Sequence, residues 1–282
     1  MIAITGATGY VGRLLCAALE RRGQAVRRLT RQPDAARGDA SFALDAPVPA
    51  GTLEGVDTLV HAAYDFRPSR EADLRRVNVD GSRRLFEAAR RQGVRRVLFI
   101  SSIASYPGSR SAYGRVKWTL EQDIEALGGT SLRPGLIFGR ERGGLFASLG
   151  HVVRRAPFVP DFGPSARLYV VHAGDLTRIV GAFLDLPDGA GPAPLAAAWP
   201  EPYTMRRVLE IIAEAARMRA RFLPAPPPLV LAGLRALETA GLRLPFRSDS
   251  LVSMLYGNPA PGLAPEVLGV PLRALDARTL SE

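Results

Sequence analysis

The sequence predicts an α/β fold built on a doubly wound parallel sheet, followed by a smaller and mostly helical C-terminal lobe. Two observations carry this prediction: strand-like and helix-like segments alternate over residues 1–184, and proline-rich connections and amphipathic helices dominate residues 185–282. Such alternation is typical of a parallel sheet covered by helices on both faces. With 282 residues, 47% of them hydrophobic, the chain can bury one large core and a smaller second core.

The segments of the first part can be assigned in chain order from their hydrophobic periodicity. Residues 1–5 predict a buried strand, and residues 10–22 predict a helix with its apolar positions on one face. Gly23 closes that helix before a second strand at residues 25–30. The expected elements that follow are a strand at 58–62, a helix at 79–91, a strand at 96–101, a helix after Tyr113 and a strand-rich segment at 130–139.

The second part of the chain predicts a connection and helices in place of the strand–helix alternation. Residues 186–202 are rich in proline, alanine and glycine and predict a connection, whereas residues 203–218 predict an amphipathic helix. A turn, a helix and a loop are expected over residues 224–250. The apolar face of residues 229–242 could serve a membrane surface, but the segment is short and weakly charged on its polar face. We therefore expect it to belong to the lobe, with no stable membrane insertion.

Composition narrows the functional classes. The net charge of +10 comes from basic residues scattered along predicted helices, without interleaved aromatic residues, so no nucleic-acid partner is predicted. Cys16 is the single cysteine, which excludes an intrachain disulfide and fits a reducing compartment. With no leader pattern or long apolar run, a cytoplasmic location is expected. The three histidines, His61, His151 and His172, are far apart in sequence and are predicted to be structural, so no metal site is expected.

Three glycines at three-residue spacing lie between the first strand and the first helix. Gly6, Gly9 and Gly12 are what a strand needs to turn tightly into a helix whose N-terminus holds a pyrophosphate. A tight turn without a ligand is the alternative reading of this pattern. Because the triplet follows a predicted strand and opens an alternating unit, the sequence favours a Rossmann-type nucleotide-binding domain over residues 1–184.

At this point the chain resembles the extended branch of the short-chain dehydrogenase/reductase superfamily, which is related to nucleotide-sugar epimerases and dehydratases. The motifs that carry the resemblance are TGATGYVG at 5–12, LVHAA at 59–63, NVDGSRRLFEAA at 78–89, FISSIASYP at 99–107, YGRVK at 113–117, LRPGLIFG at 132–139 and VVHAGDL at 170–176. They follow the family's order over the first part of the chain. Residues 185–282 match only loosely, through VLGVPL, so the resemblance says little about the substrate. We expect these residues to form a smaller substrate-binding lobe.

The resemblance places Ser102, Tyr113 and Lys117 on the family's catalytic positions. It implies that Tyr113 donates a proton to a developing alkoxide, that Ser102 hydrogen-bonds the same oxygen, and that Lys117 lowers the phenol pKa and holds the cofactor ribose. Composition adds independent weight, because Lys117 is the only lysine among 37 basic residues and lies one helical turn after Tyr113. Arginine and lysine differ most where a compact charge with a tunable pKa is needed.

The cofactor set follows in part from the motifs and in part from the end of the second strand. That stretch, RRLTRQP, has no acid before Asp34, so NADP(H) is favoured and NAD(H) stays open. Thr30 and Arg31, and less surely Arg28, are the expected partners of a 2′-phosphate. The predicted cofactor-binding residues are Gly6, Thr8, Gly9, Tyr10, Val11, Gly12, Thr30, Arg31, Ala62, Ala63, Asn78, Lys117, Pro134, Gly135 and Leu136.

Three functions remain open on the sequence. The favoured one is an NADPH-dependent reductase or dehydrogenase for a small, largely apolar carbonyl or alcohol; the candidate pocket residues are Tyr64, Phe66, Ile103, Pro107, Phe138, Phe146 and Phe158. The alternatives are a nucleotide-sugar epimerase, with Arg167 at a diphosphate, and a non-catalytic NADP-binding scaffold or sensor. A dehydratase is disfavoured by Ile103 and Ala104 after the hydroxyl residue. A small-molecule substrate is expected, and a homodimer stays open.

Overall fold

A seven-stranded sheet forms the centre of the computed structural model, which describes residues 1–282 except 69, 141–142, 165, 189–193, 243 and 245. All neighbouring strands run parallel, in the order β11-β6-β5-β4-β1-β2-β3. The strands are β1 (Ile2–Thr5), β2 (Val26–Thr30), β3 (Ala40–Ser41), β4 (Thr58–His61), β5 (Arg96–Ile100), β6 (Thr130–Pro134) and β11 (Leu195–Ala197). This order confirms the predicted Rossmann-type α/β fold.

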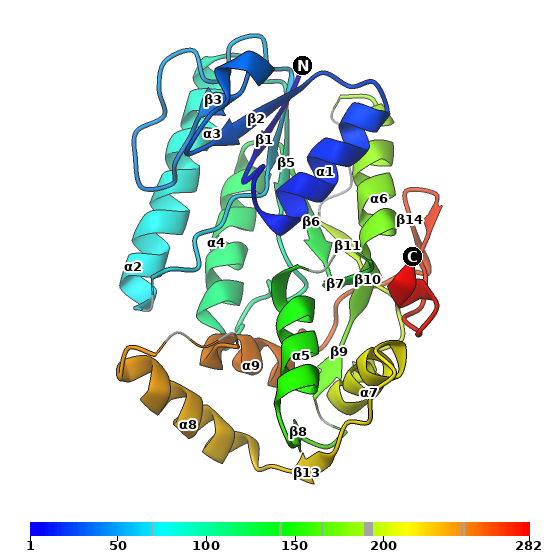
Figure 1. Cartoon of the computed structure of the whole chain (residues 1–282). Helices are drawn as coiled ribbons and strands as arrows, with labels where there is room; N and C mark the ends of the chain where they lie inside the picture. The colour runs from blue at the N-terminus through cyan, green and yellow to red at the C-terminus, as the bar shows by residue number, and fades with distance from the viewer. Residues whose placement is uncertain (69, 141–142, 165, 189–193, 243, 245) are drawn as a thin grey trace.

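Helices cover both faces of the sheet (Figure 1). On one face lie α1 (Tyr10–Arg21) and α6 (Ala173–Asp185), and on the other lie α3 (Gly81–Arg91) and α4 (Ala112–Ala126). Strand β1 shows how the sequence serves both layers, because successive side chains of a strand point to opposite faces. Ile2 and Ile4 join the core beneath α1 and α6, whereas Ala3 joins the core beneath α3.

The helix that precedes β5 is longer than the sequence predicts. Helix α2 (Glu71–Arg75) continues through a π-helical turn (Arg76–Asp80) into α3, so the helical stretch begins eight residues before the expected start at residue 79. The first turns of this helical stretch are mostly charged, so they lack the regular spacing of apolar residues from which a helix is predicted. Gly81 sits at the junction, where a Cβ atom would lie 2.2 Å from the carbonyl oxygen of Leu44.

A second hydrophobic core fills the lower half of the molecule in Figure 1 and takes residues from both sides of residue 184. Its elements are α5 (Gly144–Arg155), β8 (Val159–Asp161), β9 (Arg167–Leu168), β12 (Tyr203–Thr204), α7 (Met205–Ala215), β13 (Phe222–Pro224), α8 (Pro227–Thr239) and α9 (Ser248–Leu255). Strand β8 pairs with β13, and β9 pairs with β12. The functional division at residue 184 into a cofactor part and a substrate part stays a prediction.

The connection expected at residues 186–202 contains the edge strand of the main sheet, which corrects that prediction. Strand β11 pairs with β6 and places Leu195 and Ala197 in the main core. The strand is a short run of mostly small residues between prolines and has no alternation of apolar and polar residues, so the sequence does not predict it. The predicted helix at 203–218 is shorter, because Thr204 caps α7 by accepting a hydrogen bond from the backbone N–H of Arg207.

Two further strand pairs complete the chain. Strand β7 (Leu136–Phe138) pairs with β10 (Val170–His172), and β14 (Glu266–Val267) pairs with β15 (Val270–Pro271). The second pair packs Val267 and Val270 into the main core. Short 3₁₀ helices lie at Ala35–Arg37 and Thr279–Ser281. Within the described ranges, no helix combines the length and the apolar character needed to cross a membrane.

Candidate active site

The glycine turn between β1 and α1 is built by close backbone contacts. Gly6 has a φ of +64°, and a Cβ atom on it would lie 2.9 Å from the backbone of Ala63. A Cβ on Gly12 would lie 2.1 Å from the Gly6 carbonyl oxygen. Gly9 is the N-cap of α1, which has neither a side-chain cap nor an acidic residue in its first turn. This helix start fits an anionic group, as the predicted cofactor requires.

The end of β2 offers a polar group and a charge at the predicted 2′-phosphate position. The buried hydroxyl of Thr30 has no hydrogen-bond partner among the described residues. Arg31 is exposed, and its charge helps to lower the pKa of Asp65, after the larger effect of the hydrogen bond from Arg67. Arg28, the weaker candidate, is engaged elsewhere, because its Nη2 donates to both carboxylate oxygens of Glu20 at 2.7 and 2.9 Å.

A buried hydrogen-bond network joins β1, β4 and α3 behind the turn. The Thr5 hydroxyl accepts from the backbone N–H groups of Ala62 and Ala63 at 3.1 Å and meets His61 Nδ1 at 2.7 Å. Nε2 of His61 meets the Ser82 hydroxyl, which donates to the Asn78 carbonyl oxygen. Burial, followed by the charge of Lys117, lowers the pKa of His61 to about 3. His61 is therefore neutral and has both ring nitrogens occupied.

Asn78 holds the loop that follows β4. Its Oδ1 accepts from the backbone N–H of Asp65 at 2.7 Å, and its Nδ2 donates to the carbonyl oxygens of Asp65 and Leu74 at 3.0 Å. Every one of these partners is a backbone group. The contact between Asn78 and the cofactor stays a prediction, whereas the described hydrogen bonds of Asn78 orient the loop that carries Tyr64 and Phe66.

The segment after β6 adjoins the loop of Ser102. The carbonyl oxygen of Pro134 accepts from the backbone N–H of Ile103 at 3.0 Å. Gly135 donates its backbone N–H to Ala197 at 2.9 Å, and a Cβ on Gly135 would lie 2.6 Å from the Tyr169 carbonyl oxygen. The edge strand β11 thus fixes the backbone of Gly135, which is predicted to bind the cofactor. The remaining predicted contacts, Thr8, Tyr10, Val11 and Leu136, lie in the glycine turn, in α1 and in β7.

The structure brings the predicted Ser102, Tyr113 and Lys117 together. Ser102 follows β5, and Tyr113 and Lys117 lie one turn apart on α4, where Ser111 caps the helix through the backbone N–H of Gly114. A side-chain hydrogen bond joins Ser102 to Tyr113. The Nζ atom of Lys117 is 5.8 Å from the centre of the Tyr113 ring and donates to the Ile100 carbonyl oxygen at 2.7 Å.

The pKa values differ from the sequence expectation that Lys117 lowers the phenol pKa. Burial raises the pKa of Tyr113 to about 12, although the Ser102 hydrogen bond opposes the shift. Burial likewise lowers the pKa of Lys117 to about 7, partly offset by the charge of Glu121. The reason is that aromatic rings enclose Lys117: the ring centres of Phe99 and Tyr64 lie 4.5 and 5.2 Å from its Nζ. Loss of contact with water is therefore the largest influence on the pKa of Lys117.

Two acidic residues that sequence reasoning missed hold α4 in place. Glu121, two turns after Tyr113, is buried between Ser101 and the guanidinium of Arg133, whose Nε lies 2.9 Å from Glu121 Oε2. Asp249 of α9 accepts from the backbone N–H groups of Ala112 and Tyr113 at 2.8 and 3.0 Å. The spacing of 113, 117 and 121 could have revealed Glu121, whereas nothing in the sequence links Asp249 to α4.

Only part of the predicted pocket lies against Tyr113. Tyr64 and Phe66 pack on its ring, with centroids 4.9 and 5.8 Å away, and the buried hydroxyl of Tyr64 has no hydrogen-bond partner among the described residues. Phe138 and Phe146 belong to the second core instead, because the β7 strand and α5 turn them inward. Ile103 is half-buried beside Ser102, and Pro107 and Phe158 are exposed.

A cavity of about 370 Å³ lies between α8, α9 and the loop that links Ser102 to Tyr113. Apolar residues and two guanidinium groups line it: Arg110, Pro228, Leu231, Ala232, Arg235, Val252 and Tyr256. Helix α9 connects this cavity to the site, because Asp249 at its start touches the Tyr113 backbone. No cluster of three metal-ligating side chains occurs in the part of the chain that the structure describes.

Comparisons with known proteins agree with this geometry. A ceramide reductase of Caulobacter vibrioides is 29% identical over 293 residues, covering 96% of this chain and 89% of the relative. A 3β-hydroxysteroid dehydrogenase/Δ5→4-isomerase of Mycobacterium tuberculosis is 27% identical and covers 94% of this chain and 79% of the relative. The solved structure of MoeE5 with UDP-glucose and NAD superposes with a TM-score of 0.72 at 21% identity, covering 99% and 95% of the two chains.

The family model for the NAD dependent epimerase/dehydratase family matches residues 2–156, which is more than half of the chain. These residues include the glycine turn and the Ser102, Tyr113 and Lys117 group. The chain therefore belongs to the NAD-dependent epimerase/dehydratase family, within the extended short-chain dehydrogenases/reductases, and is an NAD(P)-dependent enzyme of that type.

Proposed function

We propose that the protein is an NADP(H)-dependent oxidoreductase that interconverts a carbonyl and an alcohol on a largely apolar substrate. The observation that carries the proposal is the meeting of Ser102, Tyr113 and Lys117 beside an aromatic wall of Tyr64 and Phe66. A serine, a tyrosine and a buried lysine are the groups that proton transfer at a carbonyl needs. The bound NADP(H) would supply or accept the hydride.

In the reductive direction, Tyr113 donates its phenolic proton to the developing alkoxide. A pKa of about 12 keeps that proton on Tyr113 at neutral pH until the more basic alkoxide forms. Ser102 gives up its hydrogen bond with Tyr113 in favour of the same oxygen, which stabilises the developing charge. In its ammonium form, Lys117 has three donor hydrogens and donates one of them to the Ile100 carbonyl oxygen. The other two remain for the ribose hydroxyls and for proton supply to Tyr113.

The apolar substrate is supported by the wall and by the named relatives. Tyr64 and Phe66 present ring surface to Tyr113, and the hydroxyl of Tyr64 is the polar group of this wall that lacks a partner within the described residues. The aligned relatives are named for a ceramide and a steroid, which are both hydrocarbon-rich molecules. A nucleotide-sugar epimerase is the second candidate, because MoeE5 shares the fold and binds UDP-glucose. Arg167 stays its predicted diphosphate contact.

A substrate panel tests the proposal. The purified protein is offered NADPH with long-chain and steroid ketones in one arm and NAD⁺ or NADP⁺ with UDP-glucose or UDP-galactose in the other, and cofactor oxidation or reduction and product isomers are measured. We expect NADPH consumption with an apolar ketone, which Tyr113→Phe abolishes and Tyr203→Phe preserves, since the Tyr203 hydroxyl bonds only the Leu275 backbone in the described contacts. Sugar isomerisation in the presence of the oxidised cofactor, without net cofactor reduction, would establish the epimerase instead. Binding of NADPH without turnover of either class would favour a scaffold.

The NADP(H) preference has its own test at β2. A charge-assisted contact of Arg31 with the 2′-phosphate is worth about 1.5 to 3 kcal/mol, so we expect NADPH to bind at least about tenfold tighter than NADH. Arg31→Ala should remove most of this difference, as measured by titration of tryptophan fluorescence or by calorimetry. Arg28→Ala is the matched control, because Glu20 already holds that guanidinium. Equal affinities for the two cofactors in the parent protein would refute the preference.

A further inference from the structure

Helix α8 exposes apolar surface that a helix of a water-surrounded protein normally buries. Of its thirteen residues, Pro227 to Thr239, the structure buries only Leu231. Leu229 is 69% exposed, and Ala232, Gly233 and Ala236 continue an exposed stripe at helical spacing. The sequence-based expectation assigned this apolar face to the lobe. The structure packs Val230, Leu231 and Leu234 against the second core but leaves the stripe that begins at Leu229 exposed.

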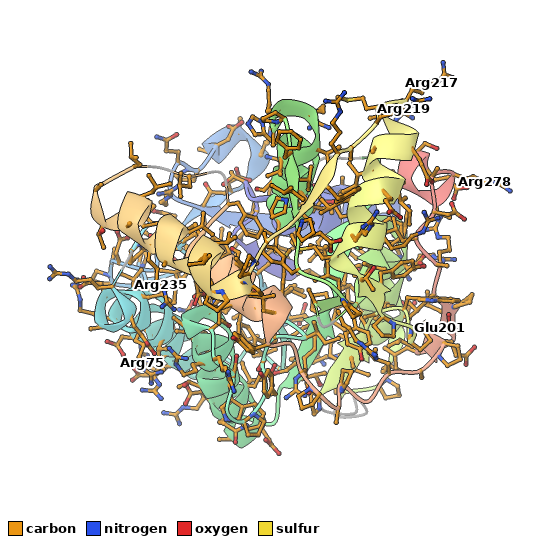
Figure 2. All side chains as sticks on the ribbon, turned by 90° about the horizontal axis from the view of Figure 1, so that it is seen from below. Arg75, Glu201, Arg217, Arg219, Arg235 and Arg278 are labelled. Atoms are coloured by element: carbon orange, nitrogen blue, oxygen red, sulfur yellow. The ribbon has the colours of Figure 1, made fainter. Side chains whose placement is uncertain are left out.

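The exposed stripe continues onto the neighbouring strands. Leu223 on β13 is 56% exposed, and Phe158, directly before β8, is 53% exposed. Because β13 pairs with β8 and leads into α8 within three residues, these side chains belong to one face of the molecule. In the view from below, α8 and β13 lie across the near side (Figure 2). We call the surface formed by Phe158, Leu223, Leu229 and the exposed stripe of α8 the basal face.

Positive charge without negative charge surrounds the basal face. The segments 143–160 and 215–237 contain six arginines and no acidic residue: Arg154, Arg155, Arg217, Arg219, Arg221 and Arg235. None of these arginines forms an ion pair within the described residues, and all six are exposed. Figure 2 shows Arg217 and Arg219 pointing outward at one edge of the face.

Three acids that border these segments and lie in the described part of the chain are committed to other partners. Asp161 pairs with Arg206, Glu214 pairs with Arg207, and Glu238 accepts from the backbone and the hydroxyl of Ser248. No acid among the described residues therefore neutralises the six arginines. Elsewhere on the surface, arginines such as Arg76, Arg83 and Arg115 pair with acids on adjacent turns or helices.

We propose that the basal face docks the protein on an anionic lipid bilayer. Exposed leucine and phenylalanine side chains, accompanied by exposed arginines that have no ion pair among the described residues, match an interface in which acyl chains lie beneath anionic headgroups. Docking of this kind is peripheral: the apolar side chains reach the headgroup boundary, and no segment crosses the bilayer. The proposal rests on the basal face alone and is independent of the substrate.

Vesicle co-sedimentation tests this directly. The full-length protein is mixed with vesicles of phosphatidylcholine alone or of phosphatidylcholine and phosphatidylglycerol in equal parts, at low and high salt. We expect sedimentation with the anionic vesicles only, weakened at high salt because counterions screen the arginines. Leu223→Asp with Leu229→Asp, and separately Arg217→Glu with Arg219→Glu and Arg221→Glu, should each reduce the bound fraction about tenfold or more.

Matched controls keep the result interpretable. Leu127→Asp changes an exposed leucine at the end of α4, and Arg90→Glu changes an exposed arginine on α3, so neither should affect vesicle binding. Thermal melting shows that each variant is folded, and loss of binding in a folded basal-face variant supports the proposal. Absent sedimentation with anionic vesicles at low salt, or equal loss in the control variants, would overturn it. So would a basal-face variant that converts a dimer to a monomer, or retention of duplex DNA with the same arginine dependence.

Discussion

Lys117 combines a buried position with an ammonium group whose pKa is brought close to neutrality. Its Nζ lies between the Ile100 carbonyl oxygen and the rings of Phe99 and Tyr64, so the space around it fits a compact group. A guanidinium is planar, larger and protonated at every accessible pH. Lys117→Arg should therefore keep the charge but displace the Tyr113 side of α4.

We expect Lys117→Arg to fold and to lose activity about as severely as Tyr113→Phe, by roughly 10²-fold or more, because residues acting as one unit are strongly non-additive. The measurement is kcat for both single variants and for the pair, with thermal melting as the check on folding. The double variant should be little worse than either single one. Near-parent turnover of Lys117→Arg would mean that the lone lysine is an accident of an arginine-rich composition.

His61 makes stability depend on pH in the acid range. Its folded pKa of about 3 lies below its unfolded value of 6.5, so between these values the unfolded chain binds one more proton than the folded chain. The free energy of unfolding therefore rises with pH across this window and falls on acidification, by about 1.6 kcal/mol between pH 6.5 and pH 5.

The measurement is urea unfolding of the parent and of His61→Gln over that pH range. The variant is expected to be less stable at pH 7, because glutamine cannot bridge Thr5 and Ser82 as the ring does, yet its stability should vary less with pH. Parallel pH dependence in the two proteins would show that His61 does not titrate on unfolding. Carboxylates contribute equally to both curves and cancel in the comparison.

Among the elements, α4 depends on a side chain from a distant part of the chain. Asp249 of α9 caps the backbone at Ala112 and Tyr113, which adds a negative charge at the helix N-terminus and fixes the start of the turn that carries the tyrosine. Asp249→Ala should cost about 1 kcal/mol of stability. It should lower kcat about tenfold, because a small displacement of a reacting group is expensive.

A second cap serves as the control for Asp249. Asp276 accepts from the backbone N–H of Thr279 at 2.7 Å, far along the chain from Tyr113. Asp276→Ala should cost similar stability and leave kcat unchanged. Comparing kcat and melting temperature for the two variants separates the positioning of Tyr113 from a general loss of stability. Equal kcat in Asp249→Ala and the parent would show that Asp249 stabilises the helix start but does not position Tyr113 for catalysis.

The elements also show which features the sequence could predict. Local patterns predict the glycine turn at Gly6 to Gly12, the strands around Ile4, Val60 and Phe99, and the helical turn of YGRVK. The apolar period, the glycine spacing and the helical spacing that predict them are all properties of residues close together in the sequence. The contact of Asp249 with the start of α4 and the Glu121–Arg133 pair both join segments that no local pattern links. Strand β11 could not be predicted for another reason. Its small residues lie between prolines, which is typical of a linker, and it is a strand only because it pairs with β6.

At the scale of the whole molecule, each of the two large cores takes residues from both sides of residue 184, so we expect the chain to unfold as one unit. Removing residues 185–282 would strip β6 of its neighbour β11 and take Leu195, Val267 and Leu272 out of the main core. It would also halve the second core, leaving Phe146 and Leu149 of α5 without the cover of α7. We expect residues 1–184 alone to lack a cooperative thermal transition by circular dichroism.

Co-expression of residues 1–184 and 185–282 as separate chains is the complementary experiment. If the packing across residue 184 is what the short chain lacks, the two fragments should associate and recover a cooperative melt. A cooperative melt of residues 1–184 alone, together with NADPH binding, would instead establish an independent cofactor domain. Fragment 185–282 alone serves as the reference for any structure that it contributes by itself.

Cys16 on α1 is the chain's single cysteine, 1% exposed, and burial raises the pKa of its thiol to about 11. At neutral pH only about one thiol in 10⁴ is ionised, and alkylating reagents attack the ionised form. The natural protein is therefore ready for single-site labelling without first removing a cysteine. A Leu229→Cys variant would carry the one reactive thiol, and a polarity-sensitive fluorophore attached there would report directly on whether α8 meets water or hydrocarbon.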